Sequence, residues 1–408
     1  MRITYLHQYF NTPEMSGGTR SYEMARRLVA MGHEVNMVTS WREEGGERHW
    51  YETEEAGIRV HWLPVPYSNH MSYSERMRAF VRFAWQAARK AASIPADVVF
   101  ATSTPLTIAL PGAYAARKQK VPMVFEVRDL WPELPIAMGA LPNPLMRSGA
   151  RWLERFAYGR SSRIVALSPG MKDGVVSSGY PEARVDVIPN SADLSLFDPD
   201  AADGAAFRRV HPELGEGPLV VYAGTMGRIN GVGYLPRIAA AGRANGSDVQ
   251  FVVVGRGQEE ERVRQIADEA GVLGKNFHMY PALPKREMPN LLAAADLAVS
   301  LFVHLEPMWA NSANKFFDAL ASGTPVAINY GGWQAELLRD TEAGLVLPPD
   351  APEEAAARLE AFLSDREGLR GAGEAARELA RSRFSRDDLA VQLERVLLDA
   401  VAGGGKGA

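Results

Sequence analysis

The chain is predicted to be an α/β protein with two parallel-sheet domains that face each other across a cleft. Short apolar runs of strand length alternate with segments of helical periodicity, which is the pattern of βαβ units. The alternation fades in a stretch rich in Asp, Pro and Gly around residues 193–217 and then starts again. A length of 408 residues suits two or three domains.

The predicted strands of the first half are apolar and rich in β-branched residues. They are 2–9, 33–40, 57–63, 97–101, 122–127, 163–167 and 185–188. The segment from Thr19 has apolar residues at helical spacing and ends at Gly32, so it is predicted to be a helix. Such a strand–loop–helix start is typical of a doubly wound sheet.

The second half repeats this pattern. Its predicted strands are 219–224, 249–255, 276–282, 296–303 and 325–329. Helical segments lie between them at 259–271, 288–295 and 314–323, and residues 351–401 are helical with a break near 382–387. We therefore predict an N-terminal domain, a linker, a C-terminal domain, a final helix and a disordered tail, at 1–195, 196–217, 218–382, 383–401 and 402–408.

Composition excludes several classes of protein. With 46% hydrophobic and 23% charged residues, the chain is typical of soluble globular proteins, and no apolar run is long enough to span a bilayer. The net charge of −4 argues against a nucleic-acid-binding protein. The absence of Cys excludes disulfides, thiolate zinc sites and a Cys nucleophile, and fits a cytoplasmic protein. The eight His residues lack metal-ligand spacing, so we expect no metal and no cofactor.

Glycines follow two predicted strands that each begin a domain. Gly17 and Gly18 precede the first helix, and Gly224 and Gly227 precede Arg228 in the second domain. Such loops offer backbone N–H groups to a phosphate or a sugar hydroxyl, and an arginine there suits a diphosphate. The alternatives are a plain turn before a helix and a surface arginine. Neither loop has the spacing of a dinucleotide-binding or ATPase fingerprint.

A third cluster lies in ANSANKFFDALASG, where Asn314, Lys315 and Asp318 begin a predicted helix. A lysine at a helix N-terminus can neutralise phosphates, and a carboxylate one turn later can accept hydrogen bonds from a ribose diol. The alternative is a salt bridge between Lys315 and Asp318 on one helix face.

Another glycine turn, Gly331-Gly332, follows the next strand and precedes Trp333. It falls at the same predicted sheet edge as the other glycine loops, because the carboxyl ends of parallel strands meet there. The three residues are therefore candidates for binding the same ligand.

The segment FEVRDLWPELP places Glu126, Arg128 and Asp129 together at the end of a buried strand. Charges in that position face the cleft, where they serve function, or pair with each other, as Glu126 and Arg128 would. His7 follows the first strand and either faces the cleft or is a core histidine.

Residues 73–92 combine arginines with Met, Phe and Trp at helical spacing. A basic amphipathic helix of this kind can lie on an anionic membrane surface. The alternative is a domain helix whose apolar face packs into the core.

These motifs together resemble those of retaining glycosyltransferases of family 4, which have the GT-B fold of two Rossmann-like domains. The resemblance covers essentially the whole chain. The segments that carry it are YLHQYFNTPEMSGGTRSYEMARRLVAMGHEV, FEVRDLWPELP, VALSPGMKDGV, VIPNSADLSLFDP, YAGTMGRING and NKFFDALASGTPVAINYGGWQAEL. The chain looks most like the branch that transfers amino sugars such as N-acetylfucosamine in O-antigen and capsule synthesis.

The resemblance implies roles for some of these residues. Gly17 and Gly18 would lie near the donor phosphates and the acceptor, Arg228 would contact the diphosphate, and Asp318 would hold the ribose diol.

The chain departs from the family pattern at three positions. Ala310 stands where the first of two family glutamates would be, and Glu306 is the candidate to replace it. Asn230 replaces a frequent lysine, which makes Lys315 the candidate for the second phosphate cation. Arg128 stands where a histidine is common, which puts the usual contact to the donor sugar in doubt.

The expected activity is metal-independent transfer of a sugar, N-acetylated and amino or deoxyamino, from a UDP-sugar to a lipid-linked or glycan acceptor, with retention of configuration. Arg228 and Lys315 would stabilise the leaving diphosphate, and Asp129 and Glu126 would orient the acceptor or stabilise the cationic sugar. His7 and Arg128 are further candidates for orienting the acceptor. The enzyme would be cytoplasmic or peripheral on the inner membrane. A non-hydrolysing UDP-sugar epimerase and a non-catalytic nucleotide-sugar-binding protein are the alternatives.

Overall fold

A computed structural model describes residues 1–15, 17–43, 49–66, 71–191 and 193–404. The chain forms two compact units, each described by itself. The N-terminal unit comprises Met1–Pro189 and Asp387–Ala408, and the C-terminal unit comprises Asn190–Arg386. The predicted α/β class with two parallel-sheet domains is confirmed.

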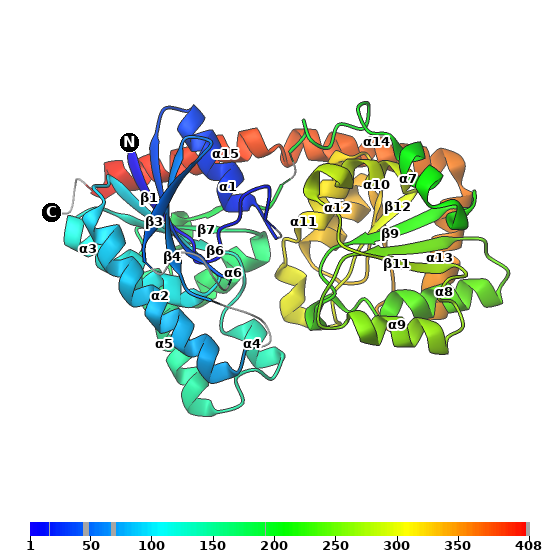
Figure 1. Ribbon diagram of the computed structural model, residues 1–408, viewed down its shortest axis with the longest axis horizontal. Coiled ribbons are helices and arrows are strands. Elements are labelled where there is room, and N and C mark those ends of the chain that lie inside the picture. Colours follow the sequence, from blue (N-terminus) through cyan, green and yellow to red (C-terminus); the bar gives the residue numbers. More distant parts are fainter. Residues whose placement is uncertain (16, 44–48, 67–70, 192, 405–408) are drawn as a thin grey trace. The chain divides into compact units, whose positions relative to one another are not determined.

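The N-terminal unit contains a sheet of eight strands in the order β3-β4-β2-β1-β5-β6-β7-β8 (Figure 1). The strands are β1 (Arg2–Leu6), β2 (Glu34–Trp41), β3 (Tyr51–Glu55), β4 (Ile58–Pro64), β5 (Val98–Thr102), β6 (Met123–Val127), β7 (Arg163–Ala166) and β8 (Val185–Val187). All neighbours are parallel except β3 and β4, which pair antiparallel. The strand order reverses between β1 and β5, where ligands of such sheets bind at the carboxyl ends.

Helices cover this sheet. They are α1 (Arg20–Ala30), α2 (Tyr73–Ser93), α3 (Ala109–Gln119), α4 (Glu133–Ala137), α5 (Pro144–Gly159), α6 (Pro169–Ser177) and the C-terminal α15 (Arg386–Gly404), with short 3₁₀ turns at η1 (Leu106–Ile108) and η2 (Glu182–Arg184). Helix α15 lies against this unit in Figure 1, and its Leu389, Leu393 and Leu397 join a core that includes Ile3 and Tyr5. The last helix of the chain therefore completes the core begun by the first strand.

The C-terminal unit has a wholly parallel sheet of six strands in the order β11-β10-β9-β12-β13-β14. These are β9 (Leu219–Ala223), β10 (Gln250–Val254), β11 (Phe277–Tyr280), β12 (Leu297–Ser300), β13 (Val326–Ile328) and β14 (Gly344–Val346). The order reverses between β9 and β12, so the loops after these two strands flank the ligand position of a doubly wound sheet.

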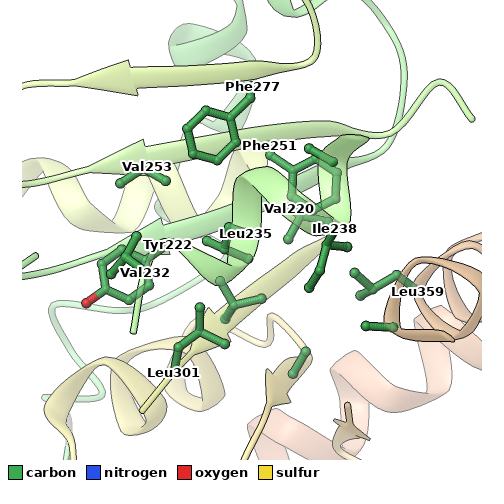
Figure 2. Close-up of a cluster of buried hydrophobic side chains, with 14 of the residues drawn as sticks. Val220, Tyr222, Val232, Leu235, Ile238, Phe251, Val253, Phe277, Leu301 and Leu359 are labelled. Carbon is green, nitrogen blue, oxygen red and sulfur yellow. The ribbon is translucent and has the colours of Figure 1, made fainter. Parts of the chain in front are cut away.

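The helices of the C-terminal unit are α7 (Gly204–Val210), α8 (Tyr234–Ala244), α9 (Glu260–Glu269), α10 (Met288–Ala294), α11 (Asn314–Ala321), α12 (Trp333–Thr341), α13 (Pro352–Ser364) and α14 (Arg366–Arg383). Its 3₁₀ turns are η3 (Pro212–Leu214), η4 (Arg228–Asn230), η5 (Lys285–Glu287) and η6 (Glu306–Ala310). Figure 2 shows β9, β10 and β11 contributing Val220, Phe251 and Phe277 to a core that α8 and α13 cover with Ile238 and Leu359.

Some elements differ from the sequence expectations. Residues 196–217, expected to be a linker, contain α7 and η3, and their Phe207 and Leu214 are buried in the C-terminal unit. Helix α15 continues to Gly404, into the expected tail, and residues 405–408 lie outside the described residues. The polar strand β3 and the short β14 escaped prediction because neither is an apolar run of strand length.

Candidate active site

The glycine loop after β1 is held by side chains of its own unit. Asn11 Nδ2 donates to the Gly18 carbonyl at 3.2 Å, and Arg42 donates to Asn11 Oδ1. Gly17 has φ +126°, and a Cβ there would lie 2.7 Å from Asn11 Nδ2. Gly17 and Gly18 are exposed, and the Thr19 side chain does not cap α1. The loop thus presents backbone to solvent, as a ligand-binding loop requires.

Glu126 is completely buried and pairs with Arg20, not with Arg128 as its structural alternative supposed. Arg20 Nη2 and Nε donate to Glu126 Oε1 at 2.9 and 3.1 Å, and Thr102 Oγ1 donates to Oε2 at 2.6 Å. Burial alone would raise the pKa of Glu126, but the charges of Arg20 and Arg128 and the hydrogen bonds hold it below its ordinary value. Both oxygens of Glu126 therefore accept hydrogen bonds from side chains of the same unit.

Arg20, which the sequence analysis missed, also donates to two backbone carbonyls, those of Pro189 at 2.6 Å and Ile188 at 2.9 Å. It therefore joins the start of α1 to the end of β6 and to the chain after β8. The only sequence signal for this role is an arginine in the first turn of a helix that follows a glycine loop. An arginine exposed to solvent at the same position would give the same signal.

His7 and Arg128 meet at the carboxyl ends of β1 and β6. Arg128 Nη1 lies 3.2 Å from His7 Nε2. A guanidinium only donates, so Nε2 accepts and the proton of the neutral ring lies on Nδ1. Burial, with the charges of Arg128 and Arg42, holds the pKa of His7 well below its ordinary value. The buried Nδ1 has no hydrogen-bond partner among the described residues. His7 is thus a neutral donor fixed in one tautomer.

Asp129 lies beside this pair and is half-buried. Thr104 Oγ1 donates to Asp129 Oδ2 at 3.0 Å. Burial raises the pKa of Asp129, and the Thr104 hydrogen bond and the Arg128 charge offset only part of this effect. His7, Arg128 and Asp129, the residues predicted to orient an acceptor, therefore occupy one sheet edge.

In the C-terminal unit the loops after β9 and β10 pack backbone against backbone. Gly224 has φ +154° and Gly255 has φ +155°, and a Cβ on Gly255 would lie 1.9 Å from the Gly224 carbonyl oxygen. A Cβ on Gly224 would lie 2.9 Å from Lys315 Cε. Close packing against backbone therefore requires glycine at 255, and the positive φ favours it at 224, where the absence of a side chain lets Lys315 approach the end of β9.

Lys315 lies over two aromatic rings, with Nζ 4.9 Å from the centroid of Tyr222 and 5.6 Å from that of Phe302. Burial lowers the pKa of Lys315 to about 8. Within the described part of the chain, no carboxylate forms an ion pair with it. A desolvated cation held by aromatic faces, without an anion, is suited to receive an anionic ligand.

Arg228 lies on η4, in the loop that follows β9. Its side chain is 77% exposed, and its Nε is 3.9 Å from Glu259 Oε1, a weak contact. It lines a hollow of about 280 Å³ whose wall also includes Gly227, Arg262 and Phe302. Phe302 thus lies under Lys315 and also borders the hollow that Arg228 lines.

Asp318 is paired with Lys285 of η5 and not with Lys315, so the predicted alternative of a helix salt bridge is wrong. Asp318 Oδ2 accepts from Lys285 Nζ, while Oδ1 is buried without a hydrogen-bond partner among the described residues. Sequence reasoning missed Lys285, because it follows β11 and only the fold brings that loop over α11.

The remaining donor-site candidates lie around η6 and the Gly331-Gly332 turn. Glu306 is exposed at the start of η6. A Cβ on Gly331 would lie 3.2 Å from the Trp309 ring, and one on Gly332 would lie 2.6 Å from the Trp309 carbonyl oxygen. The turn is therefore made of glycine so that Trp309 can pack on it.

Two other predicted residues border this turn. Trp333 Nε1 donates to the Asn311 carbonyl at 2.9 Å. Asn314 is half-buried and is the first residue of α11. The loop before α11 is thus fixed by several hydrogen bonds, among them those of Asn190 to the Ser312 hydroxyl and carbonyl, at the sheet edge that carries Lys315.

Comparisons with known families agree with this architecture. The family "Glycosyl transferase 4-like domain" matches residues 17–191, and the family "Glycosyl transferases group 1" matches residues 204–379. A GDP-mannose-dependent alpha-(1-6)-phosphatidylinositol monomannoside mannosyltransferase of Mycobacterium tuberculosis is 25% identical over 398 residues, 93% of this chain and 94% of the relative. The alpha-maltose-1-phosphate synthase of Mycolicibacterium smegmatis is 29% identical over 303 residues, 69% of this chain and 74% of the relative.

Solved structures share the fold. Sucrose-phosphate synthase of Thermosynechococcus elongatus superimposes with a TM-score of 0.80 at 17% identity, over 98% of this chain and 99% of that chain. The Anabaena protein HepE in complex with UDP-glucose superimposes with a TM-score of 0.72 at 17% identity, over 98% of this chain and 100% of that chain.

Two α/β units with these matches define an enzyme that transfers sugars. The chain belongs to the GT-B glycosyltransferases, with a glycosyltransferase 4-like N-terminal half and a group 1 C-terminal half. This assignment favours the glycosyltransferase prediction over the epimerase and the non-catalytic binding protein.

Proposed function

We propose that this glycosyltransferase takes its sugar from a UDP-sugar, retains the anomeric configuration and needs no metal. The observation that carries the proposal is Lys315, a desolvated ammonium without a carboxylate partner among the described residues, next to the strand β9 that leads to Arg228. A leaving diphosphate gains negative charge in the transition state, and cations already in place stabilise that charge without reorganisation. Two protein cations would supply what a divalent ion supplies elsewhere.

The transferred sugar is proposed to be an N-acetylated amino or deoxyamino sugar. Two relatives are named for such substrates: the 2-deoxystreptamine N-acetyl-D-glucosaminyltransferase of Streptomyces fradiae, 30% identical over 202 residues, and the alpha-D-kanosaminyltransferase of Streptomyces kanamyceticus, 24% identical over 243 residues. The resemblance of NKFFDALASGTPVAINYGGWQAEL to the amino-sugar branch points the same way. The acceptor would be a lipid-linked or glycan precursor of a bacterial surface polysaccharide.

In the proposed mechanism the leaving phosphate takes the proton of the acceptor hydroxyl, so no protein base is required. The neutral His7 and the Arg128 and Asp129 side chains beside it would orient the acceptor through hydrogen bonds. We do not propose that Glu126 contacts the acceptor, because both of its oxygens already accept hydrogen bonds from Arg20 and Thr102. Arg20 and Glu126 would hold the glycine loop and the end of β6 in register.

A thermal-shift panel of nucleotide sugars in EDTA, followed by a transfer assay on the ligands that stabilise the enzyme, tests this proposal. A ligand at about 100 times its dissociation constant should add ~2.7 kcal/mol to the free energy of unfolding. Stabilisation by a UDP-sugar, unaffected by EDTA, would support both the donor and the metal independence. Stabilisation by GDP-sugars alone would refute the UDP assignment, and binding that requires a divalent ion would refute metal independence.

We also propose that α2 rests on an anionic membrane surface, so that the enzyme is cytoplasmic and peripheral. No helix in the described residues is long and apolar enough to cross a bilayer. One face of α2 packs inward through Phe83, Ala87 and Ala91, which are buried. A second apolar row is exposed instead, and it consists of Met77, Val81 and Trp85.

The charges of α2 suit such a surface. Arg78, Arg82 and Arg89 are exposed on the same helix, and Arg89 lies over the Trp85 ring at 4.7 Å. An apolar row bordered by arginines matches the boundary between acyl chains and anionic headgroups. A lipid-linked acceptor would be met at that surface.

A further inference from the structure

Lys285 and Asp318 form an ion pair that presents a donor and an acceptor side by side. Lys285 Nζ donates to Asp318 Oδ2. The Asp318 side chain is 13% exposed, and Oδ1 contributes essentially none of this exposure because it is buried. Of the two carboxylate oxygens, only Oδ2, which is next to Lys285, can therefore reach a ligand.

The Lys285 ammonium is held in place from a second side. Its Nζ lies 4.6 Å from the centroid of the buried Phe197 ring, and its side chain remains 31% exposed. An ammonium has three N–H donors, and one of them is used by Asp318. The position of this cation is thus fixed by an aromatic face and a carboxylate, and its other two N–H groups form no further hydrogen bond within the described part of the chain.

We infer that Lys285 is the second half of the ribose-recognition site of the nucleotide donor. In this arrangement one ribose hydroxyl donates to Asp318 Oδ2 and its neighbour accepts from Lys285 Nζ. A vicinal diol fits such a pair because each hydroxyl can both donate and accept. The lysine would supply one contact to the diol and the carboxylate the other.

The inference rests on the proposed function, because it needs a ribonucleotide in the C-terminal unit. It goes further by assigning a residue from the loop after β11 to the recognition of the 2′- and 3′-hydroxyls. It does not depend on the base, because a UDP donor and a GDP donor carry the same ribose.

The test is isothermal titration of the full-length protein with UDP, 2′-deoxy-UDP and 3′-deoxy-UDP, and with the corresponding guanosine ligands. Loss of one hydrogen bond to a charged group weakens binding about tenfold or more, so the wild type should prefer the ribonucleotide by at least that factor. In Lys285→Met the preference over one of the two deoxy ligands should fall to near one, because the contact to that hydroxyl is gone. Lys285→Arg should retain most of the preference for the ribonucleotide.

Arg286→Met is the matched control, because Arg286 is the neighbouring cation, its side chain is 81% exposed and it contacts only Glu287 at 4.0 Å among its described ion pairs. It should leave both affinities and their ratio unchanged. If Lys285→Met does not fold, Lys285→Gln replaces it, and the same ratio of ribonucleotide to deoxyribonucleotide affinity is measured.

Three results separate the possible failures. Equal weakening of ribo- and deoxyribonucleotides in Lys285→Met, with the ratio preserved, would show a purely structural ion pair and overturn the inference. A wild type that binds UDP or GDP without distinguishing the deoxy ligands would overturn it as well. A wild type that binds none of these nucleotides would refute the proposed function itself.

Discussion

Arg20 and Glu126 form a buried ion pair in which Arg20 Nη2 lies 2.9 Å from Glu126 Oε1 and both side chains are at most 2% exposed. The pair joins the first turn of α1 to the last residues of β6, which are far apart in sequence and adjacent at the edge of the sheet that carries His7 and Asp129. It thereby couples the glycine loop to the strand end from which the predicted acceptor-orienting side chains project.

Replacing Arg20 with Met should therefore destabilise the protein strongly. Removal of one partner leaves the buried Glu126 carboxylate unpaired, which costs ~3 to 5 kcal/mol of unfolding free energy. Urea denaturation followed by circular dichroism measures this loss. Arg2→Met, which removes the exposed Arg2–Asp97 pair at 2.7 Å, is the control and should cost no more than ~1 kcal/mol. Similar losses in the two variants would contradict the role of the buried pair.

Donor binding should depend on pH through Lys315. Its pKa of about 8 lies below the ordinary value because burial disfavours the charged form, so the ammonium loses its proton as pH rises through about 8. UDP affinity, measured by titration between pH 6.5 and 9.5, should fall over that range, and binding near pH 8 should take up protons.

Lys315→Met should bind UDP about tenfold to a hundredfold more weakly at pH 7 and should lose this pH dependence. The free energy of unfolding depends on pH in the opposite direction to the UDP affinity. Between pH 8 and the ordinary pKa of lysine the unfolded chain binds more protons than the folded chain, so the unfolding free energy contributed by Lys315 rises with pH. If the UDP affinity of Lys315→Met changed with pH as that of the wild type does, Lys315 would not be part of the phosphate site.

Arg228→Ala should abolish sugar transfer and leave the fold intact, because the side chain is largely exposed and makes only a weak contact with Glu259. Transfer from a UDP-sugar and a thermal melt measure the two properties. Arg264→Ala, which removes an exposed arginine of α9 with side-chain contacts of 3.9 and 4.0 Å, is the control. Undiminished transfer in Arg228→Ala would refute its assignment to the diphosphate.

Gly255→Ala should disrupt the loops after β9 and β10 together, because the added Cβ would overlap the Gly224 carbonyl oxygen. We expect a loss of ~1 to 3 kcal/mol in unfolding free energy and a loss of nucleotide binding. Gly371→Ala is the matched control, since it lies inside α14 with no atom within 4 Å of the new Cβ and should be neutral or stabilising. Normal nucleotide binding by Gly255→Ala would contradict this prediction, because it would show that binding does not need the close packing of the two loops.

The proposed membrane contact of α2 predicts an effect of charge. Each basic residue next to an anionic bilayer contributes ~1 kcal/mol, so Arg78→Ser with Arg82→Ser should lower binding to phosphatidylglycerol vesicles about thirtyfold. Flotation of the protein with such vesicles measures this change. The control variant carries Arg366→Ser and Arg370→Ser, two exposed arginines of α14. Equal binding by the α2 variant and the wild type would refute the membrane contact.

Much of the fold was predictable from the sequence because apolar runs and helical periodicity report burial directly. The pattern identified two parallel-sheet units and most of their strands. It missed β3 because its residues are polar and only half of them face the protein, and it treated residues 196–217 as a linker because Asp, Pro and Gly obscure the helix α7.

The site was less predictable, because ion-pair partners come from distant parts of the chain. The sequence placed Glu126 next to Arg128 and Asp318 near Lys315, whereas the structure pairs them with Arg20 and Lys285. Sequence spacing identifies which charges lie on one element, and it carries no information on charges that another loop brings to them. The glycine loops were visible from the sequence, but their mutual packing required the fold.

The position of α15 has a consequence for biosynthesis. Its Leu393 and Leu397 are fully buried in the core that contains Ile3 and Tyr5, so the unit that is translated first receives its final core residues last. The C-terminal unit is continuous from Asn190 to Arg386 and has all its strands and helices before α15 leaves the ribosome. The usual vectorial order, in which the amino-terminal domain folds first, is therefore inverted at its last step. A chain cut before α15 would carry a complete C-terminal unit joined to an N-terminal unit that lacks Leu389, Leu393 and Leu397 of its core.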